Sequence, residues 1–168
     1  MESLYRDKPK VLLDYEVQKE IEKLIYPYPL LDSILTIEPE AAIDAWKDTK
    51  NINANTTYNW YINELSNFGD SILVAPIAIV IETSGDSYNA VFSLRPMKYQ
   101  SKEWTIKTLT GVSGNQQIDI IKELYGKLIW THKRTVQSKF RIKNTNASNA
   151  FDFTIIFFYL KKPAIRWL

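Results

Sequence analysis

The segment Ser71–Pro96 reads SILVAPIAIVIETSGDSYNAVFSLRP, and its first half, Ile72 to Thr83, contains a single charged residue, Glu82. This apolar run is shorter than the ~20 residues that a membrane-crossing helix requires, and it contains Pro76. Ile, Val and Ala dominate it, and both of its alternating faces are apolar. The sequence therefore predicts a strand that is covered on both faces. Two interpretations of what covers the second face stay open: the chain's own helices, or another subunit.

The chain after about residue 69 follows the period of two that is typical of strands. The tight-turn signal Ser84-Gly85-Asp86 separates two apolar runs, so 71–83 and 87–95 are predicted to form a hairpin. Further strands are predicted at 102–110, 133–143 and 150–160, with a helix at about 115–130.

The first 69 residues show helical spacing instead, and helices are predicted at 13–26, about 39–48 and 58–68. The expected fold is α+β: N-terminal helices followed by a mainly antiparallel sheet with one inserted helix, in the order ααα-βββ-α-ββ. We expect a single domain over residues 1–168, with a helical layer at 1–69 and the sheet at 70–168.

The composition argues against several functions. The chain has no cysteine, which excludes disulfides, thiolate catalysis and cysteine-based metal sites. Its only histidine, His132, has cationic neighbours and is interpreted as a surface residue at a helix end. Asp44 and Asp48 are interpreted as part of a solvated helix face. We therefore expect no enzyme activity, no cofactor and no metal.

The charge and the N-terminus bear on partners and location. The net charge of +2 is too small to indicate nucleic acid binding by itself. Residues 1–10 contain no apolar signal region, and no membrane span is predicted. The expected location is the cytoplasm, or a virion assembled there.

The basic stretch HKRTVQSKFRIK, residues 132–143, is the main candidate for a polyanion or acidic-partner surface. On a strand, its cationic side chains project to one side; they are Lys133, Lys139, Arg141 and Lys143. Three interpretations stay open: a solvated or edge face, an acidic protein partner, and nucleic acid. Nucleic acid is the least favoured, because the whole chain is nearly neutral.

The C-terminal stretch AFDFTIIFFYLKKPAIRWL, residues 150–168, is apolar on both faces in its second half and ends in an apolar tail. Either the N-terminal helices cover it, or it docks on a neighbouring subunit. The interface candidates are Ile156, Phe158, Leu160, Ile165, Trp167 and Leu168, together with Leu73, Ile77 and Ile79 of the first strand.

The preferred function is a non-enzymatic structural or assembly subunit of a larger particle, a homo-oligomer or a complex with other protein subunits. The predicted order of three strands, a helix and two strands is similar to that of small bacteriophage tail-tube and tail-terminator proteins. These assemble into rings through their sheets, so the similarity implies a virion or tail component, although the three leading helices depart from that pattern. The alternative is a small soluble binding module, such as an immunity or inhibitor protein, whose cationic strand faces an acidic partner. A carboxylate-based metal enzyme is a third, less favoured hypothesis.

Overall fold

The computed structural model of the chain describes residues 10–22, 40–62, 72–83, 87–95, 103–126, 128–132 and 139–164. In these residues strands predominate, and there are two helices, α2 (Asp14–Glu22) and α4 (Ile120–Glu123). The strands are β1 (Lys10–Val11), β2 (Ala42–Ile52), β3 (Thr57–Tyr61), β4 (Ile72–Thr83), β5 (Tyr88–Arg95), β6 (Trp104–Val112), β7 (Gln116–Asp119), β8 (Thr131–His132), β9 (Lys139–Asn144) and β10 (Phe151–Pro163).

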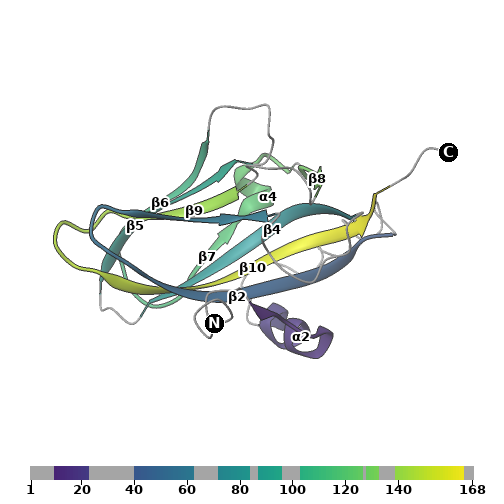
Figure 1. The fold of residues 1–168 in the computed structure, drawn as a ribbon, viewed down its shortest axis with the longest axis horizontal. Coiled ribbons are helices and arrows are strands. Elements are labelled where there is room, and N and C mark those ends of the chain that lie inside the picture. Colours follow the sequence, from purple (N-terminus) through teal and green to yellow (C-terminus); the bar gives the residue numbers. More distant parts are fainter. Residues whose placement is uncertain are drawn as a thin grey trace, which may run out of the picture.

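The strands form two antiparallel sheets. Within the described residues, the first sheet has six strands in the order β1-β2-β10-β4-β7, with β8 also paired to β4. The second sheet has four, in the order β3-β9-β5-β6. Figure 1 shows β2, β10 and β4 side by side, with β5, β6 and β9 in a separate layer.

The eight longer strands among the described residues pair in a nested pattern. β2 pairs with β10, β3 with β9, β4 with β7, and β5 with β6. These four pairings form one long antiparallel hairpin of eight strands. Two further pairings, β10 with β4 and β5 with β9, fold this hairpin into the two sheets. An eight-stranded antiparallel hairpin wound into two sheets in this way is a jelly roll.

The α+β prediction is therefore wrong, and two of the expected N-terminal helices are strands. Residues 39–48 fall largely in β2, and residues 58–61 lie in β3. In β2 the neighbouring side chains of Ala45 and Trp46 are both buried because they enter different clusters on opposite faces of the sheet. The similarity to phage tail proteins depended on the predicted order of elements, so the strand order removes its basis.

The predicted hairpin of 71–83 with 87–95 is also wrong, although both strands exist. β4 belongs to the six-stranded sheet and β5 to the four-stranded sheet, and each pairs elsewhere. The predicted turn at 84–86 lies outside the described residues. β4 and β5 follow each other in the chain, but in a jelly roll such strands can lie in different sheets.

The expected helix at 115–130 contains a strand and one helical turn instead. β7 occupies Gln116–Asp119, and the Asp119 carboxylate then accepts a hydrogen bond from the backbone N–H of Lys122 at 3.0 Å, which caps α4. Tyr125 and Gly126 both have left-handed backbone angles, with φ of 58° and 80°, and end the helix immediately.

Pro76 lies inside β4, at an irregularity of the strand pairing. One neighbour, β10, shifts register between Phe158 and Tyr159, so that Tyr159 lies opposite Pro76. On the other side, β7 pairs with Ala78–Ile81 and β8 with Leu73–Val74, which leaves Pro76 between them. A proline is accommodated at such an irregularity because its missing N–H has no ladder partner to satisfy.

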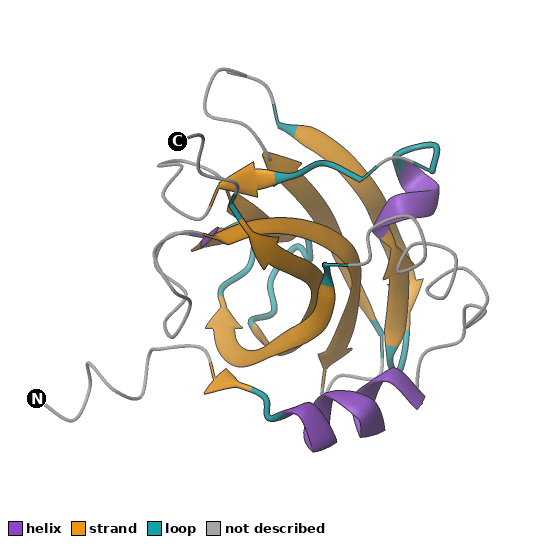
Figure 2. Ribbon diagram, turned by 90° about the vertical axis from the view of Figure 1, so that its right-hand side faces the viewer, coloured by secondary structure: helices purple, strands orange, loops and turns teal. Residues whose placement is uncertain are grey.

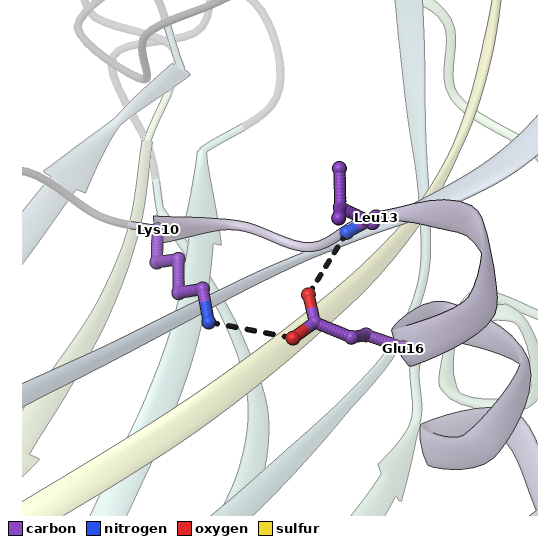
Figure 3. Close-up of polar contacts among 3 residues, drawn as sticks. All are labelled: Lys10, Leu13 and Glu16. Carbon is purple, nitrogen blue, oxygen red and sulfur yellow. Dashed lines mark hydrogen bonds and ion pairs between the residues drawn. The ribbon is translucent and has the colours of Figure 1, made fainter.

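α2 is confirmed as a helix over the described part of 13–26, and it is tied to the edge of the six-stranded sheet. The Glu16 carboxylate accepts the Leu13 backbone N–H at 3.1 Å and lies 3.5 Å from the Lys10 ammonium (Figure 3). This is the glutamate half of a capping box. The hydrogen bond from Leu13, and then the charge of Lys10, lowers the pKa of Glu16. Figure 2 shows α2 running outside the strands of the sandwich.

Candidate functional site

The space between the two sheets is filled by aromatic rings. Phe140 of the four-stranded sheet stacks on Phe157 of the other sheet, with ring centroids 4.4 Å apart, and on Trp60 at 5.4 Å. Trp46 continues the stack, 5.3 Å from Phe157 and 4.6 Å from Tyr159. All five side chains are buried. Because side chains fill this interior, the surfaces that the molecule offers to partners lie outside the sheets.

Most of the predicted interface residues of the first and last strands are buried by the chain itself. Ile156, Phe158 and Leu160 lie on the outer face of the six-stranded sheet, where they are at most 1% exposed. They form one cluster with Ile77 and with Val17 of α2. The second cover of this sheet thus comes, at these residues, from the same chain.

The remaining interface candidates are divided between the core and the undescribed tail. Ile79 is fully buried in the cluster between the sheets. Leu73 is partly buried on β4, opposite His132 of β8. Ile165, Trp167 and Leu168 lie outside the described residues, so their predicted role as an interface stays a prediction.

Three of the four predicted cationic residues lie on one face of β9, the outer face of the four-stranded sheet. Lys139, Arg141 and Lys143 alternate with the buried Phe140 and Ile142. Lys133 lies outside the described residues. We call the surface formed by Lys139, Arg141, Lys143 and the neighbouring Glu103 the cationic face.

The carboxylate of Glu103, which no sequence pattern links to β9, lies on this face. Glu103 is 3.1 Å from the Lys139 ammonium and also pairs with the Arg141 guanidinium. The side chains of Glu103 and Lys139 are only 16% and 13% exposed, so this is a partly buried ion-pair cluster. Lys143 at its end is exposed. The face keeps a net positive charge, since three cations share one carboxylate.

The two aspartates that were expected on a solvated helix are buried on β2 and structural. Asp48 accepts the indole N–H of Trp60 at 2.8 Å, a bond between the two sheets. Asp44 accepts the Lys161 ammonium at 2.7 Å. Burial, and then the charge of Asp44, raises the pKa of Tyr159 above its ordinary range. Within the described residues, no three His, Asp or Glu side chains come together as a metal site.

A network of asparagines that the sequence did not indicate closes one end of the sandwich. Asn144 is fully buried and donates to the carbonyls of Ile52 at 2.8 Å and Asn149 at 3.0 Å. Asn146 exchanges hydrogen bonds with the backbone of Asn89 at 3.0 and 3.1 Å. These bonds fix the chain between β9 and β10, so the network is structural.

Neither described helix has the length and apolar character needed to cross a membrane.

Fold and surface together define a jelly-roll protein with a filled interior, whose candidate binding sites are on its outside. No protein-family model matches the chain, and no curated protein matches it. Among solved structures, a structure of infectious bursal disease virus, Gx strain, is similar with a TM-score of 0.37 and 9% identity, over 72% of this chain and 31% of that chain. The structure of the Drosophila NLP core, whose description refers to pentamer formation and histone binding, has a TM-score of 0.36 and 11% identity, over 72% of this chain and 99% of that chain. A structure of the Gt strain of infectious bursal disease virus has a TM-score of 0.31 and 10% identity, over 74% of this chain and 38% of that chain. Likenesses at these TM-scores establish neither a family nor a function.

Proposed function

We propose that this protein is a non-enzymatic subunit of a larger protein assembly, such as a virion assembled in the cytoplasm, and that it works through contacts on its outer surface. The filled interior supports this proposal most directly. A jelly roll that holds a ligand between its sheets needs room there, and here the aromatic stack of Phe140, Phe157 and Trp46 occupies that room. Jelly rolls form the building blocks of viral capsids, and the same fold also occurs in lectins and cupins.

The test is the oligomeric state of the purified chain. We expect sedimentation velocity to show a defined oligomer, or larger particles, that grows with protein concentration. Electron microscopy of the same samples then separates closed particles from open aggregates, because subunits related by symmetry give uniform rings or shells. A chain that stays monomeric at every soluble concentration, without and with coexpressed neighbouring gene products, contradicts the proposal.

A second candidate function is a binding module for an acidic protein, and the cationic face favours it. The expected ligand probe is polyglutamate, whose binding should weaken as salt rises because the attraction is electrostatic. Single-stranded RNA serves as the competing probe, since nucleic acid would give a steeper salt dependence.

Matched variants of the cationic face make this test specific. Lys143→Gln should weaken polyglutamate binding, and Glu103→Gln should strengthen it by removing the one carboxylate. Lys122→Gln, an exposed lysine on α4, is the control for a general loss of charge. If Lys122→Gln and Lys143→Gln have equal effects, the cationic face is not the binding surface.

A further inference from the structure

A pocket opens at one edge of the sandwich, between β6 and the end of α4. Its volume is about 380 Å³, within the range of specific binding pockets. Its walls are mainly apolar and aromatic; they are formed by Trp104, Thr105, Ile106, Glu123, Leu124, Tyr125 and Ile129. The pocket therefore suits an apolar or aromatic group rather than a phosphate or a metal ion.

Tyr125 stands at the rim of this pocket in an unusual conformation. Its φ of 58° places a bulky residue in the left-handed region, which disfavours every side chain with a Cβ. The backbone holds it there, because the N–H of Tyr125 bonds to the Lys122 carbonyl at 3.1 Å and that of Gly126 to the Ile121 carbonyl at 2.8 Å. The side chain is 93% exposed, more than any other large apolar side chain in the described residues. An exposed tyrosine ring on a backbone held by hydrogen bonds, beside an apolar pocket, is a typical anchor of a protein interface.

An ion pair lies beside the pocket, between Glu123, which lines it, and Lys107. Lys107 of β6 lies 3.7 Å from Glu123 of α4, and both side chains are partly exposed, at 48% and 35%. A pair this exposed adds little to stability, so its members are free to exchange partners.

We propose that this Tyr125 patch, defined as the pocket with Tyr125, Lys107 and Glu123, is a two-fold contact between two copies of this chain. In a two-fold interface a surface meets itself, so each projecting group needs its complement within the same surface. The patch supplies both pairs: a projecting ring beside a pocket, and a lysine beside a glutamate. Tyr125 of each copy enters the pocket of the other, and Lys107 of each copy faces Glu123 of the other.

The first experiment removes the ring without disturbing the backbone. Tyr125→Gly keeps the left-handed conformation, which glycine adopts freely, so the fold and the thermal midpoint should be retained. We expect sedimentation velocity to show self-association weakened roughly thirty-fold, the effect of losing a central interface anchor. Tyr15→Ala is the matched control, because Tyr15 is 69% exposed on α2 and should leave association unchanged.

The second experiment reverses the charges. Lys107→Glu makes the rim acidic and Glu123→Lys makes it basic, so each variant alone should associate more weakly than the wild type. Mixed together, the two variants should form a heterodimer, because acidic and basic rims then face each other. The double variant, which carries both changes, should recover self-association.

This inference rests on the proposed function, and the outcomes separate the two. If the wild type assembles and Tyr125→Gly and the single charge reversals assemble equally well, the two-fold contact is wrong and the assembly function stands. If mixing the charge variants gives no heterodimer, the charge pairing is wrong. A wild type that remains monomeric throughout contradicts both.

Discussion

Replacing Phe158 by alanine tests whether the chain itself covers the outer face of the six-stranded sheet. Phe158 is 1% exposed and belongs to the same cluster as Val17 of α2. Truncating a buried phenylalanine costs about 3–5 kcal/mol, the sum of the lost apolar burial and the remaining cavity. Since a domain is stable by only about 5–15 kcal/mol, the variant should lose about a fifth or more of its stability.

Urea unfolding followed by tryptophan fluorescence measures this loss. With a slope of about 1–3 kcal/mol per molar urea, the midpoint should fall by roughly 2 M. The fall should be the same at two protein concentrations tenfold apart, because the lost contacts are within one chain. Two controls bracket the effect: Phe158→Leu should cost about 1 kcal/mol, and Leu13→Ala, at a position 73% exposed, should have a negligible effect.

An opposite pattern would refute the reasoning. If Phe158→Ala unfolds at the wild-type urea concentration while self-association falls, the side chain lies between subunits and α2 does not cover this face.

Three further predictions concern stability. Asn144→Ala should lower the unfolding free energy by about 2–3 kcal/mol, because the buried carbonyl of Ile52 and the partly buried carbonyl of Asn149 lose a donor; a thermal melt of the variant tests this, and an unchanged midpoint contradicts it. Burial raises the pKa of Tyr88 to about 12. The stability that the neutral Tyr88 side chain contributes is therefore fully present below the unfolded pKa of about 10, and it is lost as the pH rises through about 12. Urea midpoints at about pH 9 and about pH 11.5 should therefore differ less in Tyr88→Phe than in the wild type, and equal differences would show that Tyr88 does not couple to pH. Trp60→Phe should lower the unfolding free energy by about 2–3 kcal/mol, since it removes the indole donor of the buried Asp48 carboxylate. Calorimetry measures this loss, with Tyr15→Phe as the control at an exposed aromatic. Equal losses in the two variants would contradict a stabilising role of the Trp60–Asp48 hydrogen bond.

Strands with long apolar runs or a clear alternation of apolar and polar residues could be predicted from the sequence. The strands expected at 71–83, 87–95 and 150–160 are confirmed as β4, β5 and β10. Their pairing could not be predicted, because a turn signal shows that the chain reverses but not which sheet it enters. The nested jelly-roll pattern depends on partners about a hundred residues apart, for which a single sequence gives no local signal.

The strands β2 and β3 were not predicted, because their sequences fit both the helical period of 3.6 residues and the strand period of two. In Ala42–Ile52, Ala45 and Trp46 satisfy a helical face as well as two faces of a strand. In Thr57–Tyr61, TYNWY, the aromatic and β-branched residues favour a strand, but Tyr58 and Tyr61 also have the spacing of a helical face.

The candidate sites show the same division between local and distant information. The shared side of Lys139, Arg141 and Lys143 follows from the strand period alone. Their pairing with Glu103 depends on sheet order. The sequence likewise shows that β10 needs cover on two faces, but not whether the cover for Phe158 comes from this chain or another. The pocket beside Tyr125 has no sequence signal, because three separate segments form it.

The nested hairpin also determines when the sheets can be completed during synthesis. β10 is the central partner of both β2 and β4, and contacts such as the 2.7 Å hydrogen bond between Thr49 and Thr154 join residues 105 positions apart. β10 is synthesised after the other described strands, so the sides of β2 and β4 that pair with it have no strand partner until then. Folds dominated by such distant pairings form slowly, in milliseconds to seconds, and are exposed to aggregation meanwhile. Completion of the six-stranded sheet therefore depends on β10, the last of the described strands to be made.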